Sequence, residues 1–184
     1  FVAKNGTTKI PINSKLIGEH QIGTLVACVD IATRLGLSVS DITRGIEKTS
    51  AYEHRMQPYS LGGAIIIDDT YNGNIDGMLA GLALLKKHTS AGRRIYVTPG
   101  LVEQGMETEA IHHRLGTAIA ESCDEVILIN NSVTQYIQDG LQEAGFSGSV
   151  RIVEDPLPFY TNLAQIVAEG DIVLMQNDWT DNYS

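Results

Sequence analysis

Seven consecutive residues, Asp68-Asp69-Thr70-Tyr71-Asn72-Gly73-Asn74, carry more polar chemistry than a simple turn requires. They follow the apolar run Ala64-Ile65-Ile66-Ile67, which is typical of a buried strand that reaches the edge of a sheet. Carboxylates at this place could bind ribose hydroxyls or a cation, and asparagine side chains could orient a substrate. The alternative is that Asn74 or Asp76 only caps the next helix while both aspartates are solvated. The residues themselves favour neither interpretation.

Two further segments follow apolar runs in the same way. Thr98 to Gly105 contains Gly100 and Gly105, which would let the backbone approach a ligand, and Glu103, which could accept an amine. A plain glycine-containing turn before a helix explains this segment slightly better. Gln176 to Tyr183 is polar and aromatic, and a frayed C-terminus is its simplest explanation. All three segments are therefore candidate parts of one site, each with a structural alternative.

Several common catalytic patterns are absent from the sequence. Neither the phosphate-binding pattern G-x-x-x-x-G-K-S/T nor the dinucleotide-binding pattern G-x-G-x-x-G occurs. The five histidines lack metal-ligand spacing, and the adjacent pair His112-His113 points to different helix faces, so at most one serves a shared site. Cys28 and Cys123 lie far apart, and Cys28 falls among apolar helical residues, where a core position is expected. We therefore predict no metal site, no disulfide framework and no Ser/His/Asp or Cys/His nucleophile.

Apolar strands alternate with helices through the larger part of the chain. The expected strands lie at 64–67, 94–98, 125–129, 150–153 and 171–175. The expected helices lie at 78–85, 107–122, 133–144 and 157–168. This alternation predicts a doubly wound, mostly parallel sheet covered on both faces, an α/β domain over residues 58–184. Ligands of such sheets bind at the carboxyl ends of the strands, where the three polar segments fall.

The first 57 residues differ from the rest. Asn5-Gly6 predicts a β-hairpin, a helical pattern begins near His20 and is capped by Gly36, and Ser40 opens a second short helix. A hairpin and two helices are too little to bury a good core alone. Because the chain also starts at Phe1 without an initiator Met, we expect residues 1–57 to be the end of a preceding domain and the chain to be an excised piece.

Composition excludes several classes of function. Thirteen Lys and Arg stand against 22 Asp and Glu, so the formal net charge is −9, and no Lys/Arg cluster suits a nucleic-acid backbone. No apolar run approaches the roughly 18 residues of a membrane span, and we expect no signal peptide. We expect a soluble cytoplasmic protein with a real core, without nucleic-acid or membrane partners.

The polar segments resemble signatures of the MurF-type Mur ligases, which build peptidoglycan precursors. Residues 68–74 are similar to the D-D-x-Y-N-A-N-P signature of that family. Leu16-Ile17-Gly18-Glu19-His20-Gln21 is similar to its G-x-H-N segment, and Glu53-His54-Arg55-Met56 to its G/H-R-M/L linker. Residues 98–105 take the place of L-G-D-M-x-E-L-G, followed by a matching His112 to Gly116. The resemblance covers essentially the whole chain in the right order.

The resemblance implies a three-domain, ATP-dependent ligase that joins an acid to an amino acid. In such enzymes ATP phosphorylates a substrate carboxylate, and an amine attacks the acyl phosphate to give an amide, ADP and phosphate. The chain would supply the end of the central domain and the whole C-terminal domain. ATP and Mg²⁺ would be held mainly by the central domain, upstream of Phe1. The implied substrates are a UDP-muramoyl-peptide-like acid and an amino acid or dipeptide, and the protein would be a monomer.

The resemblance also implies roles for single residues. The residues expected at the nucleotide are His20 and Gln21 near adenine, Arg55 at the phosphates, and Asp69 with Asp68 at the ribose. Arg55 and Asp69 are the expected catalytic residues. The residues expected to face the incoming amino substrate are Tyr71, Asn72, Asn74, Glu103 and His112.

Several positions depart from the family pattern. Gln21 and Thr24 stand where asparagines are usual, Ile75 replaces a proline, and Thr98-Pro99-Gly100 replaces L-G-D. Gln176-Asn177-Asp178 replaces a K-G-S ending. The last two changes resemble a MurF-like paralogue group, so the amino substrate need not be D-alanyl-D-alanine.

Two alternatives to a Mur-type ligase remain. The departures also suit a paralogue that has lost catalysis and acts as a binding or scaffold protein. A stand-alone dinucleotide-binding domain is the weaker alternative, because its glycine fingerprint is missing.

Overall fold

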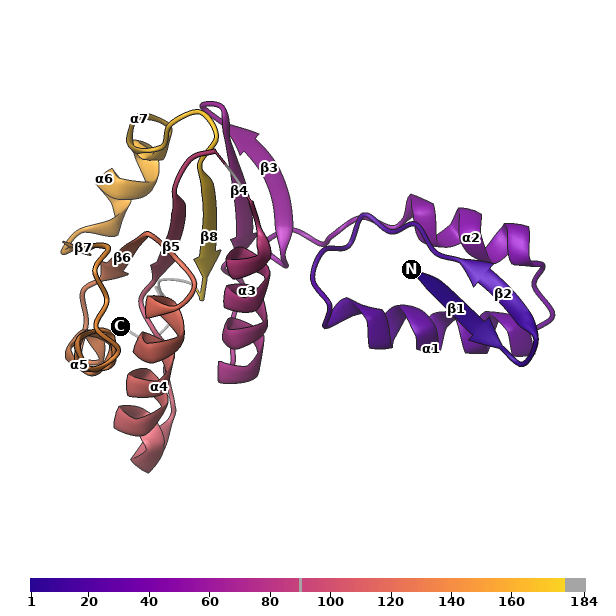
Figure 1. Ribbon diagram of the computed structural model, residues 1–184, viewed down its shortest axis with the longest axis horizontal. Coiled ribbons are helices and arrows are strands. Elements are labelled where there is room, and N and C mark those ends of the chain that lie inside the picture. The colour runs from indigo at the N-terminus through magenta and orange to yellow at the C-terminus, as the bar shows by residue number, and fades with distance from the viewer. Residues whose placement is uncertain (90, 178–184) are drawn as a thin grey trace. The chain divides into compact units, whose positions relative to one another are not determined.

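The computed structural model describes residues 1–89 and 91–177 (Figure 1). The chain divides into two compact units, Phe1–Tyr52 and Glu53–Ser184. No helix in the described part of the chain is both long and apolar enough to cross a membrane.

The first unit pairs a hairpin with two helices. Its elements are β1 (Val2–Asn5), β2 (Thr8–Pro11), α1 (Gln21–Arg34) and α2 (Val39–Lys48). One small core joins them, made of Ala3, Ile10, Ile12, Leu25, Val29, Ile42 and Ile46. Gly36 ends α1 as predicted: it has φ = 82°, and its N–H donates to the Thr33 carbonyl.

Three details of this unit differ from the sequence-based expectations. The hairpin turn consists of Gly6 and Thr7, because Asn5 still pairs with Thr8, and Gly6 takes the positive φ of 57°. Ser38, rather than Ser40, caps α2, and its side chain accepts the N–H of Asp41. Cys28 is exposed and not a core residue, because it lies off the stripe of α1 that faces the hairpin.

The second unit contains a six-stranded sheet in the order β3-β4-β8-β5-β6-β7. Its strands are β3 (Gln57–Leu61), β4 (Ala64–Asp69), β5 (Arg94–Thr98), β6 (Glu125–Ile129), β7 (Ser149–Val153) and β8 (Ile172–Gln176). Its helices are α3 (Ile75–Lys87), the short 3₁₀ turn η1 (Gly105–Glu107), α4 (Thr108–Ala120), α5 (Thr134–Glu143), α6 (Pro156–Thr161) and α7 (Leu163–Ile166). Strands β4 to β8 are parallel to one another, so the predicted mostly parallel α/β sheet is confirmed.

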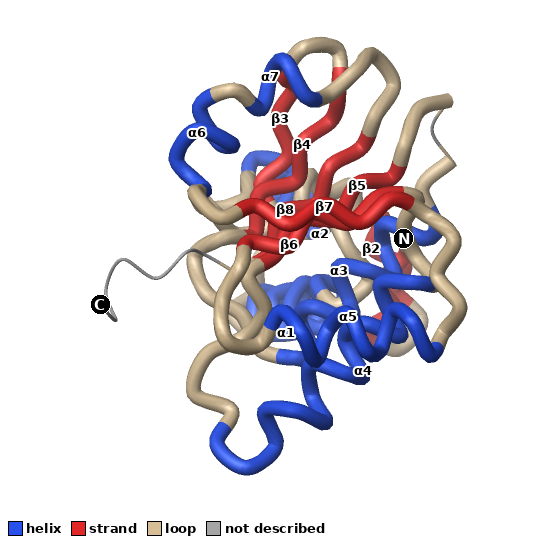
Figure 2. The backbone as a smooth tube through the Cα atoms, turned by 90° about the vertical axis from the view of Figure 1, so that its left-hand side faces the viewer, coloured by secondary structure: helices blue, strands red, loops and turns tan. Residues whose placement is uncertain are grey.

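Helices cover both faces of this sheet. α3, α4 and α5 lie on one face, and α6 and α7 lie on the other (Figure 2). The strand side chains facing α6 and α7 are apolar and buried; they include Ile66, Ile95, Ile127 and Val173, which pack with Phe159. Such two-sided burial explains why the central strands β5, β6 and β8 read as nearly continuous apolar runs, whereas the edge strand β7 is exposed at four of its five residues.

The antiparallel edge strand β3 is an addition to the predicted sheet. It pairs with β4 through a two-residue turn, Gly62-Gly63, in which both glycines have positive φ. The expected helix at 157–168 is also different, because it is broken at Asn162 into α6 and α7. Neither change moves the carboxyl ends of the parallel strands.

An ion-pair network ties the amino ends of three strands together. The guanidinium of Arg93 donates to Asp171 at 2.6 Å and to Glu125 at 2.7 Å. Asp171 has only 2% of its surface exposed, and it also accepts the backbone N–H of Arg93 at 2.8 Å and of Ala168 at 2.9 Å. The network fixes the amino ends of β5, β6 and β8, opposite to the edge that carries the candidate site.

Candidate functional site

The three polar segments predicted from sequence meet at one edge of the sheet. Because β8 lies between β4 and β5, the residues after these three strands are neighbours. A Cβ built on Gly73 would lie 3.5 Å from both Leu101 and the Asn177 side-chain oxygen. The Asn177 amide also donates to the Gly100 carbonyl. The segments around 73, 101 and 177 therefore form one polar edge, while residues 178–183 of the third segment lie outside the described residues.

Asp68, the first residue of the adjacent acid pair, is buried rather than solvated. Only 7% of its surface is exposed. Its Oδ1 accepts both the N–H and the hydroxyl of Thr70, at 3.1 and 2.7 Å, and its Oδ2 lies 2.8 Å from Nδ1 of His54. The carboxylate thus ties the end of β4 to the turn that precedes β3.

Asp69 points to the opposite face and joins a chain of side-chain hydrogen bonds. Its Oδ2 accepts Nε2 of Gln176 at 2.8 Å, and Oε1 of Gln176 accepts the hydroxyl of Tyr96 at 3.1 Å. Burial raises the pKa of Tyr96 well above its ordinary value, so this hydroxyl keeps its proton and donates. Oδ1 of Asp69 accepts the backbone N–H of Met56 at 3.1 Å. Both aspartates therefore bind the turn at residues 53–57.

Arg55 lies at the centre of that turn. Its Cζ atom is 4.3 Å from the centre of the Tyr71 ring, and its Nη1 donates to the Asn72 carbonyl at 3.3 Å. All three side chains are exposed. The structure thus brings three of the predicted site residues together and places a permanent positive charge beside the segment that follows β4.

Asn74 is the N-cap of α3. Its Oδ1 accepts the N–H of Gly77 at 2.8 Å, which is the structural alternative given for this residue. Its side chain remains exposed beside the polar edge.

His112 supports the loop at residues 98–105 from beneath. It has no exposed surface, its Nε2 accepts the N–H of Leu101 at 2.9 Å, and its Nδ1 lies 2.6 Å from the Thr108 carbonyl. Since Nε2 accepts, Nδ1 carries the proton and donates to that carbonyl. The expectation that His112 faces a substrate is therefore wrong for this structure, because both ring nitrogens are used inside the protein.

The remainder of this loop is fixed from two sides. The N–H of Gly100 donates to Oγ1 of Thr98 at 3.0 Å, and the Asn131 amide donates to the Pro99 carbonyl at 2.6 Å. Gly100 has φ = 86°, and a Cβ there would lie 2.7 Å from Val133. Glu103 is exposed on the loop, with a left-handed φ of 59°. An anchored loop thus presents an exposed carboxylate, consistent with the proposed contact to an amine.

The residues expected near adenine lie in the first unit. His20 immediately precedes α1 and is exposed, and Gln21 is its first residue and is half-buried. Gly18 has φ = 95°, a backbone conformation that favours glycine, and a Cβ there would lie 2.3 Å from the His20 ring.

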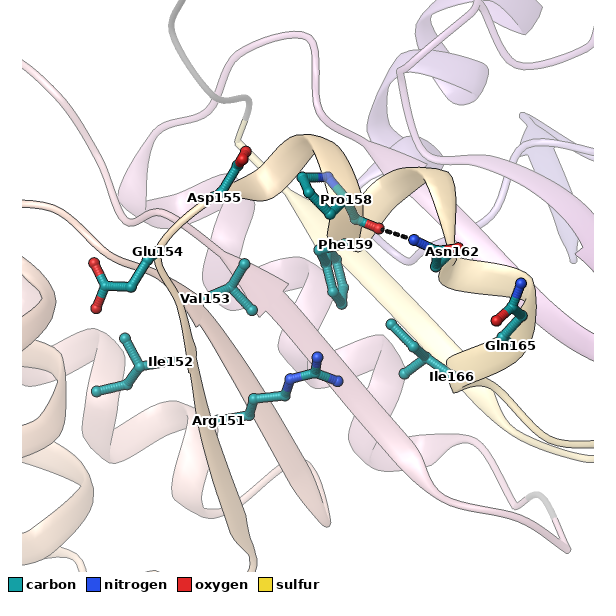
Figure 3. A pocket seen from close by; sticks show the side chains of 10 residues that line it. All are labelled: Arg151, Ile152, Val153, Glu154, Asp155, Pro158, Phe159, Asn162, Gln165 and Ile166. Carbon is teal, nitrogen blue, oxygen red and sulfur yellow. Dashed lines mark hydrogen bonds between the residues drawn. The ribbon is translucent and has the colours of Figure 1, made fainter.

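A separate hollow of about 530 Å³ lies along β7, α6 and α7 (Figure 3). Phe159 and Val153 contribute apolar surface, and the guanidinium carbon of Arg151 lies 5.9 Å from the Phe159 ring centre. None of the site residues predicted from sequence lines it. Within residues 1–89 and 91–177, no group of three or more His, Cys, Asp or Glu could hold a metal ion.

A protein-family model matches residues 54–176, and its description is Mur ligase, glutamate ligase domain. The chain belongs to the Mur ligase family. The match covers the second unit from His54 to Gln176, which includes the polar edge except Asn177.

Similar proteins agree with this Mur ligase assignment. The UDP-N-acetylmuramoyl-tripeptide–D-alanyl-D-alanine ligase of Haemophilus influenzae is 25% identical over 158 residues, which are 85% of this chain and 34% of that protein. MurF of Acinetobacter baumannii has a TM-score of 0.72 at 24% identity, over 94% of this chain and 37% of that one. The MurF ligase of Thermotoga maritima, solved in complex with ADP, has a TM-score of 0.74 at 19% identity, over 93% and 37%. The chain spans about a third of the length of the curated relatives that it matches.

Sequence reasoning assigned no individual site role to three supporting residues of this Mur ligase domain, although two of them, Gln176 and Asn177, belong to the third polar segment. Gln176 is 1% exposed and links Asp69 to Tyr96, Asn177 joins two loops, and Asn131 holds Pro99. The position of Asn131 directly after β6 was an available signal, because the carboxyl ends of neighbouring parallel strands converge.

Proposed function

We propose that the chain is part of an ATP-dependent ligase of the Mur type, which joins a substrate carboxylate to an amine. Family membership and the relatives' greater length support this proposal. In it, residues 1–57 end the central ATP-binding domain, and residues 58–184 are the C-terminal domain. The exposure of Ile22, Val26 and Ile31 on α1, between 39% and 57%, supports further packing of the first unit.

The observation that carries the proposal is the position of Arg55. Its charge is held by Tyr71 and the Asn72 carbonyl at the carboxyl edge of the sheet, where ligands of open α/β sheets bind. A guanidinium there suits the phosphates of a nucleotide, because it is always charged and presents several N–H donors. In a chain of net charge −9, such a cation offsets the repulsion between the acidic protein and the ATP phosphates.

ATP, when bound, supplies the phosphoryl group that activates the substrate carboxylate. The chain's own residues then bind and orient. Arg55 neutralises phosphate charge, and Asp69, which is only half-buried, accepts hydrogen bonds from the ribose. His20 and Gln21 contact adenine. Mg²⁺ is held mainly by the part of the ligase upstream of Phe1.

The amino substrate is proposed to bind along the exposed side chains of the polar edge. Tyr71, Asn72 and Asn74 present a ring and two amides, and Glu103 presents a carboxylate that suits an ammonium group. The acid is proposed to be a UDP-muramoyl-peptide-like molecule in cytoplasmic peptidoglycan precursor synthesis. The amine is an amino acid or a dipeptide, and because Pro99 and Gln176 depart from the family pattern it need not be D-alanyl-D-alanine.

A substrate screen tests this proposal. The longest natural chain that contains these residues is incubated with ATP, the UDP-muramoyl peptide and a panel of amino acids and dipeptides. We expect amide product and phosphate release with one class of amine. The 184 residues alone should form no product, because no phosphate-binding loop occurs among them. Amide formation by the 184 residues alone would contradict the proposal that a region outside them holds the ATP phosphates.

One observation favours a second candidate function, a non-catalytic binding or scaffold protein. Gln176, which stands where the family has a lysine-containing ending, is 1% exposed, and both ends of its amide are used inside the protein. The region upstream of Phe1 separates the candidates: an intact G-x-x-x-x-G-K-S/T favours the ligase, and a broken one favours the scaffold.

A further inference from the structure

The backbone on both sides of Arg55 is left-handed. His54 has φ = 58° and Met56 has φ = 47°, although both residues carry a Cβ. Side-chain-bearing residues adopt this conformation at an energetic cost, so surrounding contacts must hold them there. Arg55 therefore lies between two backbone positions that other groups fix.

The end of β4 supplies those contacts. Asp68 binds the His54 ring at 2.8 Å, and Asp69 accepts the Met56 N–H at 3.1 Å. The carbonyl of His54 accepts the N–H of Tyr71 at 3.2 Å. The turn is thus held on each side of Arg55 by the strand that also carries its stacking partner.

The contact between His54 and Asp68 joins a side chain of the turn directly to the end of β4. Asp68 is buried and fixed by two hydrogen bonds from Thr70, so it is a rigid acceptor. The His54 side chain is about half exposed, and the backbone N–H of His54 donates to Oε1 of Gln57 at 3.2 Å. The imidazole therefore links a strained surface turn to a rigid point of the sheet.

We propose that His54 and Asp68 are positioning residues whose hydrogen bond holds the left-handed turn that places Arg55 over Tyr71. In the reaction they act through Arg55 and do not touch substrate. The role of Arg55 at phosphate rests on the proposed function, whereas the placement of Arg55 over Tyr71 is a property of this chain alone.

Three substitutions of His54 separate the hydrogen bond from the backbone conformation. In His54→Asn, the side-chain nitrogen takes the place of the imidazole Nδ1, and asparagine tolerates a left-handed backbone. His54→Gly keeps the backbone conformation but loses the hydrogen bond, and His54→Ala loses both. Asp68→Ala removes the acceptor, and His88→Ala at the end of α3 is the matched control.

The readout is the NMR shift that the Tyr71 ring causes in the Arg55 side-chain protons of the 184-residue chain, with Tyr71→Leu as the zero point. We expect the native shift in His54→Asn and His88→Ala. We expect at least half of it to be lost in His54→Gly, His54→Ala and Asp68→Ala, with the remaining backbone spectrum unchanged in the two His54 variants. A full shift in His54→Gly, or its loss in His54→Asn, would overturn the proposal.

Ligase kinetics of the longer protein give an independent readout. His54→Gly should lower kcat at least tenfold and leave the KM of the amine unchanged, and His54→Asn should restore kcat. Equal loss in both variants would contradict positioning through the hydrogen bond. If no ligase activity exists at all, the proposed function fails while the NMR result still decides the role of His54.

Discussion

The guanidinium carbon of Arg55 lies 4.3 Å from the centre of the Tyr71 ring, at the carboxyl end of β4. The antiparallel pairing of β3 with β4, in which Gln57 lies opposite Asp68, brings the segment before β3 beside the segment after β4. A cation over an exposed aromatic face contributes about 0.5–1 kcal/mol. This contact orients a long, exposed side chain that would otherwise sample many rotamers.

Removing the Tyr71 ring should weaken nucleotide binding moderately. In the proposed longer ligase, Tyr71→Leu is expected to raise the Kd for ATP by about two- to fivefold, the equivalent of the lost cation–π contact. Tyr71→Phe keeps the ring face and should bind ATP like the native protein. Isothermal titration calorimetry measures both. An equal loss in Tyr71→Phe would mean that the hydroxyl, and not the ring face, matters.

Gly100 should tolerate alanine far less well than Gly105, although both have positive φ. A Cβ on Gly100 would lie 2.7 Å from Val133 and 2.9 Å from the His112 ring, whereas a Cβ on Gly105 meets nothing within 4 Å. We expect Gly105→Ala to cost about 1 kcal/mol of unfolding free energy and Gly100→Ala about 2–4 kcal/mol. Urea unfolding, followed by the NMR signals of β5, measures the difference. Similar losses of unfolding free energy in the two variants would show that the loop shifts easily to accommodate the Cβ at position 100.

The buried amide of Gln176 should stabilise the second unit. Gln176→Leu leaves the Tyr96 hydroxyl buried without this acceptor, so we expect a loss of roughly 2–4 kcal/mol of unfolding free energy. Adding Tyr96→Phe to that variant should recover part of the loss, because both partners are then removed. Urea unfolding of the four proteins in this cycle gives the coupling. Strict additivity would contradict a direct hydrogen bond.

The second unit should lose stability in acid through Asp171. Burial opposes ionisation of this carboxyl, but hydrogen bonds from Arg93 and from the Ala168 N–H outweigh burial and lower its pKa below the ordinary value. A carboxyl with a lowered folded-state pKa stabilises the fold above its unfolded pKa of about 3.9, and this stabilisation is lost as pH falls through the folded pKa. We therefore expect the unfolding free energy to fall below about pH 4.

The Asp171→Asn variant checks the origin of that acid sensitivity. It should be less stable at pH 7 and should lose less unfolding free energy between pH 5 and pH 2 than the native chain, by roughly 1–2 kcal/mol. Asp139→Asn, an exposed carboxylate on α5, should follow the native curve. If the unfolding free energy fell equally between pH 5 and pH 2 in all three proteins, Asp171 would not be the cause of the acid sensitivity.

The parallel part of the fold could be predicted from the sequence because its central strands β5, β6 and β8 are buried on both faces and read as apolar runs. β3 could not, since Pro58, Tyr59 and Ser60 lie on an exposed edge and show no apolar alternation. Its one signal was the pair Gly62-Gly63, which suits a two-residue hairpin turn. Cys28 shows a different limit of sequence-based prediction. Helical spacing predicts that one side of α1 is buried, but not how many residues on that side are buried, and Cys28 is exposed.

The position of the candidate site could be predicted from the sequence more readily than the hydrogen bonds within it. The rule that ligands bind at the carboxyl ends of parallel strands selected the segments after β4, β5 and β8. The burial of Asp68 and His112 depends on side-chain directions that only packing decides. Asp68 reads as a ligand group in sequence, yet it binds His54 and Thr70, because the turn before β3 folds over it.

The most direct test of a Mur-type ligase is the rate of ATP-dependent amide formation by the longer protein with Arg55 changed. Arg55→Ala should lower kcat/KM on the order of 100-fold or more, because phosphate charge is no longer neutralised, and Arg55→Lys should recover only part of the rate. Circular dichroism should show an unchanged fold, since the Arg55 side chain is exposed. Full activity in Arg55→Ala would remove Arg55 from the nucleotide site and contradict the proposed function of this edge.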